Sequence, residues 1–224
     1  MWLIDSSIGR KLIMSITGVF LVLFLLFHSI MNFVVLISHE GYNAICEFLG
    51  ANWYAVAATS VLAGGFIVHI LYALYLTYQN KRARGDESYA MKQNQKGISW
   101  ASNNMLVLGV VVFGFLGLHL FQFWSKMMFV ELTHMGDLEK ATNGAFWVDF
   151  YFSQPVYAIL YIVWLVALWF HLTHGVWSAL QTAGLNNQTW LPRVKSISNI
   201  VATIIILLFM AVPVYYLLGF GSCC

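Results

Sequence analysis

The segment Leu168-Trp169-Phe170-His171-Leu172-Thr173-His174-Gly175-Val176-Trp177 places two histidines in a charge-free apolar run of membrane-spanning length. An imidazole in hydrocarbon is costly unless a partner takes up its ring nitrogen. Each intramembrane histidine is therefore a candidate functional residue. The question that follows is which group binds His171.

Five runs of this kind, without any Asp, Glu, Lys or Arg, occur in the chain of 224 residues, of which 60% are hydrophobic and 9% charged. Each run can cross the hydrocarbon layer, which is roughly 30 Å thick and takes about 20 helical residues. We therefore predict an all-α membrane protein, a single domain over residues 1–224. Its five transmembrane helices should form a bundle and should cover residues 12–37, 54–78, 105–124, 156–180 and 197–219.

Lys and Arg gather on one side of the predicted helices. Nine of them flank the first helix or lie in the connections after the second and fourth helices: Arg10, Lys11, Lys81, Arg82, Arg84, Lys92, Lys96, Arg193 and Lys195. The opposite side has only Lys126 and Lys140. The positive-inside rule then predicts a cytoplasmic N-terminus.

The connections on the outer side differ in length. Residues 38–53 are predicted to form a tight, partly ordered loop. In the longer connection, residues 146–152 indicate either a segment lying at the membrane interface or a solvated loop with a membrane-facing edge. Pro213 should kink the last helix without chemical consequence.

The cysteines form no disulfide framework and no metal-ligand spacing. They are Cys46, Cys223 and Cys224, and the last two are expected to be an inert tail. Because no Cys-x-x-Cys-His motif occurs, any haem would be held without covalent links.

Five of the seven histidines fall within the predicted helices, and their depths can be compared. At about 1.5 Å per residue, His28 and His119 lie roughly 21 to 24 Å from the cytoplasmic edge. His69 and His171 lie about 14 Å from the same edge. Four histidines from four helices thus form two pairs at two depths, about 8 to 10 Å apart.

Two facing imidazoles are the axial ligands of a six-coordinate haem b, and iron would satisfy the costly neutral rings. Small residues near these histidines would leave room for a porphyrin, although small residues also serve plain helix packing. They are Gly64, Gly65, Gly114, Gly117, Ala167 and Gly175. His174, one turn from His171, is an alternative ligand, a propionate contact or a helix-joining residue, and depth alone does not decide.

The whole chain resembles the cytochrome b membrane-anchor subunits of succinate dehydrogenase and fumarate reductase, the single-chain two-haem type (type B). The likeness rests on Arg10-Lys11, His28-x-x-x-Asn32, His69-x-x-Tyr72, His119 and, most specifically, His171-x-x-x-Gly175-Val176-Trp177. The resemblance implies that His69 and His171 bind the proximal haem b, and that His28 and His119 bind the distal haem b. It leaves His174 outside the coordination sphere.

The resemblance also implies a complex in the bacterial cytoplasmic (inner) membrane. A flavoprotein subunit with FAD and an iron-sulfur subunit would dock on the cytoplasmic face, against the basic loop between the second and third helices. This chain would react with menaquinone or another quinone, pass electrons to the iron-sulfur subunit and contact lipid. Dicarboxylate chemistry would occur on a partner, and no nucleic acid is expected.

The quinone site is the least defined part of the prediction. The family has members with a glutamate near the outer end of the second helix, and Glu47 is the nearest match; a carboxylate there could accept protons from a quinol. An exposed loop glutamate is the alternative. Some members also carry a glutamate two residues before the fourth haem ligand, where this chain has Trp169, which puts a transmembrane proton route at that position in doubt. A route through the haem propionates stays open.

Two other functions compete with this one. The cytochrome b subunit of a membrane-bound hydrogenase or formate dehydrogenase also has histidines on several helices, but its partners lie on the outer face. A haem-free proton-coupled transporter would need discontinuous helices or intramembrane counter-charges, and the sequence indicates neither.

Overall fold

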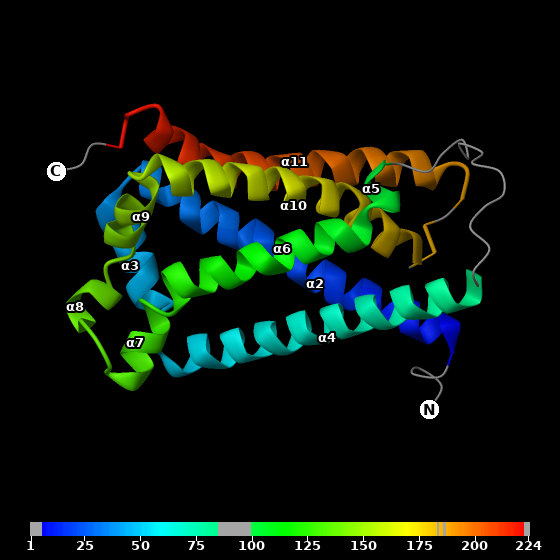
Figure 1. Cartoon of the computed structure of the whole chain (residues 1–224), viewed down its shortest axis with the longest axis horizontal. Helices are drawn as coiled ribbons and strands as arrows, with labels where there is room; N and C mark the ends of the chain where they lie inside the picture. The colour runs from blue at the N-terminus through cyan, green and yellow to red at the C-terminus, as the bar shows by residue number, and fades with distance from the viewer. Residues whose placement is uncertain (1–5, 85–99, 183, 186, 222–224) are drawn as a thin grey trace.

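The computed structural model of the chain describes residues 6–84, 100–182, 184–185 and 187–221 (Figure 1). Within these ranges the chain is helical and contains no strand. Lys92, Lys96, Cys223 and Cys224, which entered the predictions above, lie outside the described residues.

Five helices are long and apolar enough to cross a membrane, as predicted. They are α2 (Ser7–Phe33), extended by the 3-10 turn η1 (Val34–Leu36); α4 (Trp53–Arg84); α6 (Met105–His119), extended by the π-helical turn η2 (Leu120–Trp124); α10 (Pro155–Thr182); and α11 (Trp190–Leu217). The all-α membrane fold class is therefore confirmed.

Two of these helices begin five or more residues earlier than predicted. We predicted that these two helices start after their flanking cations, at residues 12 and 197, whereas α2 begins at Ser7 and α11 at Trp190. Ser6 caps α2 by accepting a hydrogen bond of 2.9 Å from the Gly9 amide. Cationic side chains within a helix end do not break the helix, because their long stems let the charge reach the polar interface.

Short helices fill the connections at one end of the bundle. The first connection contains α3 (His39–Phe48), so the prediction of a loop over residues 38–53 was wrong. Ser38 caps α3 by accepting a hydrogen bond of 3.0 Å from the Gly41 amide. The second connection contains α7 (Met128–Thr133), α8 (Leu138–Ala141) and α9 (Gly144–Phe152).

The predicted interfacial segment, residues 146–152, forms most of α9. Its buried residues, Val148, Tyr151 and Phe152 among them, pack against the rest of the protein, and α9 contacts α3, α10 and α11. The alternative of a solvated loop is therefore excluded. We call the end of the bundle with α3, α7, α8 and α9 the α9 end, and the opposite end, with α5 (Trp100–Asn103), the α5 end (Figure 1).

The bundle is centred on α10, which packs against α11, α2 and α6. Hydrogen bonds join these helices at buried or partly buried positions. Such bonds are common in membranes, because the hydrophobic effect contributes little to the association of helices in lipid. Ser15 of α2 donates to the Ala179 carbonyl at 2.7 Å, and the Trp169 indole donates to Thr203 of α11 at 3.0 Å. By contrast, α4 packs mainly against α2 alone.

Candidate functional site

The structure brings His28 and His119 together near the α9 end. His28 lies in α2, and His119 is the last residue of α6, immediately before the π-helical turn. Their ring centroids are 5.9 Å apart and the rings are nearly perpendicular, at 83°. We call His28 and His119 the outer pair. A single π-helical turn inside an α-helix often occurs at functional sites, and here it directly follows one of the two imidazoles.

Aromatic rings surround the outer pair. Phe24 stacks on His28 with centroids 5.1 Å apart, and Phe209 of α11 lies 5.6 Å from the same ring. His119 contacts Phe123 and Trp164 at 5.3 and 5.9 Å. These walls are apolar and keep water from the two imidazoles.

Beyond the outer pair, towards the α9 end, lies a buried cluster that we call the aromatic layer. Its aromatic members are Tyr42, Phe152, Tyr161, Trp164 and Tyr216, with Phe115 and Phe123 packed against them. The layer draws residues from α3, α9, α10 and α11, together with α6 and the turn after it. It separates the outer pair from the polar groups of the α9 end.

A polar contact links His28 to this layer through Asn32. The Asn32 amide nitrogen lies 3.3 Å from His28 Nδ1 and donates to the His28 carbonyl at 2.8 Å. Tyr42 in turn donates to the Asn32 side-chain oxygen at 3.1 Å. Burial raises the pKa of the Tyr42 phenol, so Tyr42 stays protonated and remains a donor.

His69 and His171 lie deeper, towards the α5 end, and we call them the inner pair. They come from α4 and α10 and are close enough for their imidazoles to interact electrostatically. Thr17 of α2 is within 3.3 Å of His69 Nδ1. The backbone of α2 also passes close, because a Cβ at Gly18 would lie 3.5 Å from His69 Cε1.

His174 does not fall outside this region. Its side chain interacts electrostatically with those of His171 and Lys195, and its ring lies 5.1 Å from that of Trp177. Lys195 of α11 places its ammonium 4.6 Å from the Trp177 ring. His174 thus belongs to a group with a cation, on the α5 side of the inner pair.

Two further observations test whether these histidines fit a haem. Three imidazole nitrogens are buried without a hydrogen-bond partner among the described residues, namely Nδ1 of His119, His171 and His174. A buried polar atom without a partner costs free energy, which a ligand can recover.

The glycines supply the second observation. At four positions near the paired histidines an added Cβ would meet no atom within 4 Å: Gly64, Gly114, Gly117 and Gly175. Gly65 differs, since a Cβ there would meet the Phe20 ring at 2.9 Å. Neutral imidazoles in pairs, buried nitrogens without partners and open glycine positions together fit a flat macrocycle held between histidines. Among the described residues no three His, Cys, Asp or Glu side chains gather in a way that could hold a bare metal ion.

Glu47, the predicted quinone-linked carboxylate, is an exposed residue of α3. Its backbone carbonyl accepts a hydrogen bond from Asn52 at 3.2 Å. The neighbouring thiol of Cys46 is partly buried, and desolvation raises its pKa to about 11, so it stays a protonated thiol near neutral pH.

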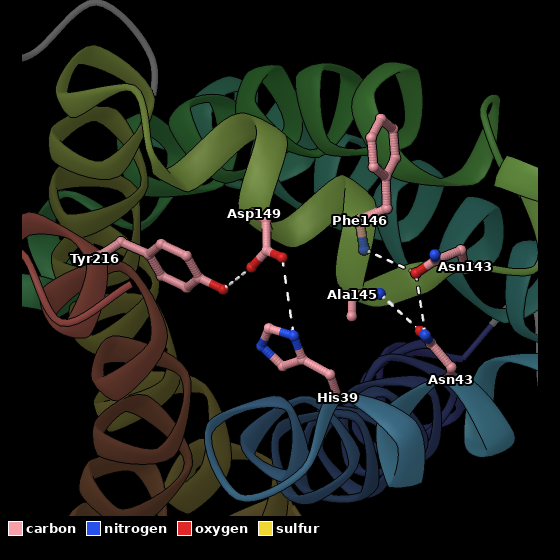
Figure 2. A network of polar contacts seen from close by, with 7 residues as sticks. All are labelled: His39, Asn43, Asn143, Ala145, Phe146, Asp149 and Tyr216. Atoms are coloured by element: carbon pink, nitrogen blue, oxygen red, sulfur yellow. Dashed lines mark hydrogen bonds and ion pairs between the residues drawn. The ribbon is translucent and has the colours of Figure 1, made fainter. Parts of the chain in front are cut away.

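Sequence reasoning missed a group of polar residues at the α9 end (Figure 2). Asp149 of α9 accepts a hydrogen bond from the Tyr216 hydroxyl and lies 3.8 Å from His39 Nδ1. It also missed the buried bond from Tyr161 to Gln122. Each group joins residues far apart in sequence, and only an acidic residue within an aromatic run, Asp149, gave a local signal.

One of three comparisons with known proteins finds a relative of this chain. No protein-family model matches the chain, and no solved structure matches it. The succinate dehydrogenase cytochrome b558 subunit of Bacillus subtilis (strain 168) is 24% identical over 184 residues, which cover 82% of this chain and 81% of the relative. The chain is thus a multi-pass membrane protein distantly similar, over most of its length, to a succinate dehydrogenase cytochrome b subunit.

Proposed function

We propose that this chain is the dihaem cytochrome b anchor subunit of a succinate:quinone oxidoreductase or quinol:fumarate reductase, with residues 1–224 forming one domain. The observation that carries the proposal is that four helices bring four histidines together as two pairs at two levels of the bundle. The similarity to a succinate dehydrogenase cytochrome b558 subunit supports it. When bound, two haems b would supply one-electron carriers between a quinone and the iron-sulfur subunit.

Each pair has a distinct role in the proposal. His28 and His119 would hold the distal haem, and His69 and His171 the proximal one. All four act as neutral imidazoles, because a metal ligand must offer a lone pair. The aromatic side chains around the outer pair exclude water, and Thr17 orients His69 by the contact at 3.3 Å. His174 and Lys195 would face a haem propionate, because a cation close to an imidazole suits a carboxylate.

The distribution of charges supports an orientation of the bundle in the membrane. Lys81, Arg82 and Arg193 are exposed cations at the α5 end, whereas the α9 end carries Glu47 and Asp149 among its acids. We infer that the α5 end faces the cytoplasm of a bacterium and receives the flavoprotein and iron-sulfur subunits. Most of the loop predicted to meet them lies outside the described residues. Menaquinone or a related quinone would then react near the outer pair.

The first experiment is a haem count on the full chain purified in detergent. A pyridine haemochrome assay should give two haems b per chain, and His28→Ala and His69→Ala should each leave one. His134→Asn is the matched control, because His134 lies in the α9-end connection with a left-handed backbone that Asn adopts readily. A chain without haem, or one in which either variant removes both haems, would overturn the proposal.

A second experiment identifies the complex. The full chain, affinity-purified from its native membrane, should bring down a flavin-containing subunit and show succinate- or fumarate-linked quinone activity. Recovery of two haems with a hydrogenase or formate dehydrogenase subunit instead would assign the chain to the competing class of cytochrome b.

A further inference from the structure

Asp149 lies at a meeting point of three helices at the α9 end (Figure 2). Its carboxylate, on α9, accepts a hydrogen bond from Tyr216 of α11 through Oδ1. Its Oδ2 is 3.8 Å from Nδ1 of His39, the first residue of α3. The side chains of His39 and Asp149 are 56% and 40% exposed, so water reaches this carboxylate directly.

Hydrogen bonds hold α9 in the orientation that this contact requires. Asn43 of α3 donates to the Asn143 side chain at 3.0 Å and accepts from the Ala145 amide at 2.9 Å (Figure 2). Asn143 also caps α9 by accepting from the Phe146 amide at 3.0 Å. The start of α9 is thereby fixed on α3, and Asp149, more than one turn later, faces His39.

The same group reaches inward to the outer pair. Tyr216 and Tyr42 both belong to the aromatic layer. Tyr42 donates to Asn32, whose amide contacts the His28 ring. Polar groups therefore enter an otherwise apolar layer from both sides. Tyr42 bonds towards the outer pair, and Tyr216 bonds to the water-exposed carboxylate of Asp149.

We propose that Asp149 is the carboxylate through which the region of the outer pair exchanges protons with the aqueous phase at the α9 end. The inference deepens the proposed function and rests on it. Oxidation of one quinol to quinone there would release two protons and two electrons, and haems held by the paired histidines would supply the one-electron acceptors. Asp149 takes up these protons one at a time at its carboxylate oxygens and passes them to water.

The groups that face Asp149 are few. From α3 it is His39, and from α11 it is Tyr216. The titratable residues of the other helices packed against α9 face elsewhere: Lys140 of α8 pairs with Asp137, while on α10 the Tyr157 ring contacts Tyr151 and Tyr161 bonds to Gln122. Among the described residues, His39 and Tyr216 are thus the titratable groups in contact with the Asp149 carboxylate.

The test measures how the midpoint potential of the outer haem depends on pH. The full-length, haem-loaded protein is titrated spectroelectrochemically at a series of pH values from about 4 to 9, a range that includes the ordinary pKa of an aspartate. The outer haem is identified as the signal absent from His28→Ala. If Asp149 exchanges protons in step with this centre, the wild-type potential falls as pH rises. Asp149→Asn should flatten that dependence, and Asp149→Glu should restore it.

Asp137→Asn is the matched control, since Asp137 is a second, exposed carboxylate at the α9 end that caps α8. It should leave the slope unchanged. If the Asp149→Asn protein loses its haem, Tyr216→Phe and His39→Asn are measured instead, because both variants keep the carboxylate. Each should partly flatten the dependence of the outer-haem potential on pH. An unchanged slope in the Asp149→Asn protein, or in both of these substitutes, would overturn the inference. Absence of haem from the wild-type chain would instead overturn the proposed function.

Discussion

Tyr161 donates a hydrogen bond of 2.7 Å to the side-chain oxygen of Gln122, and both side chains are buried, with exposed fractions of 6% and 1%. Gln122 lies in the π-helical turn that follows His119, and the Tyr161 ring is 6.3 Å from the His119 ring. The bond thus ties α10 to the segment that orients one imidazole of the outer pair.

Tyr161→Phe should lower the stability of the folded protein by about 1–3 kcal/mol, because it leaves the Gln122 oxygen buried without its donor. Thermal unfolding in detergent, followed by circular dichroism, measures this loss. The double variant Tyr161→Phe, Gln122→Leu should recover part of it, since no polar atom is then left unpaired. A double variant less stable than Tyr161→Phe would show that Gln122 contributes through other contacts.

The paired histidines should be separable by spectroscopy. His119→Ala should remove the same haem signal as His28→Ala, because the two rings are 5.9 Å apart, and His171→Ala the same signal as His69→Ala. Reduced-minus-oxidised spectra of the four purified variants make the assignment. If His119→Ala removed the signal assigned to His69, the pairing would be wrong.

His174→Ala should keep both haems. His174 interacts with Lys195 and packs against Trp177, so its loss should shift the midpoint potential of the inner haem without removing that haem. The measurement is a redox titration with a haem count on the same sample. Loss of the inner haem in His174→Ala, with retention in His171→Ala, would reverse the assignment of the ligand.

Gly18→Leu should disturb the inner pair and spare the outer one. A Cβ at Gly18 would already lie 3.5 Å from His69 Cε1, so the remaining atoms of leucine would meet the imidazole. Ala58→Leu, on the exposed surface of α4, is the control with the same final residue. Haem counts and spectra of both should show loss of the inner haem from Gly18→Leu only, and equal loss in both would point to general destabilisation.

The Cys46 thiol should react slowly with alkylating reagents. Burial raises its pKa from 9.0 to about 11, so at pH 8 its thiolate fraction is roughly 100-fold below that of an ordinary thiol. Mass spectrometry of Cys223→Ser, Cys224→Ser protein treated with iodoacetamide should show a rate that keeps rising with pH to about 11 in the folded state. The stabilising effect of this shift is present below about pH 9 and is lost as the pH rises through 11. A folded-state rate that levels off near pH 9 would contradict the burial of this thiol.

Charge-free runs of membrane-spanning length predicted the five long helices. A charge is costly in hydrocarbon, so segments that cross a membrane contain few charged residues. That criterion failed at the helix ends, where Arg10 and Lys195 lie within helices. It also missed α3, whose residues carry no long apolar run and whose start depends on the Ser38 cap.

Some features of the candidate site could likewise be predicted from the sequence, and others could not. The depth of a histidine follows from its position in a helix, so the two levels could be predicted from residue counts alone. The direction in which a side chain points from the helix axis depends on packing. The contact between His174 and Lys195 could therefore not be predicted. Asp149, Tyr216 and His39 are brought together by the fold of three separate elements, and no local pattern joins them.

The division of each pair between helices has a consequence for biogenesis. His28 and His69 leave the ribosome first, on α2 and α4, whereas His119 and His171 are on α6 and α10. Under the proposed pairing, neither haem would have both of its ligands until α6 has been inserted, and the inner haem would also require α10. The peripheral helix α4 packs mainly against α2. Binding of a cofactor at the inner pair would therefore fix α4 against α10 as a final step of assembly.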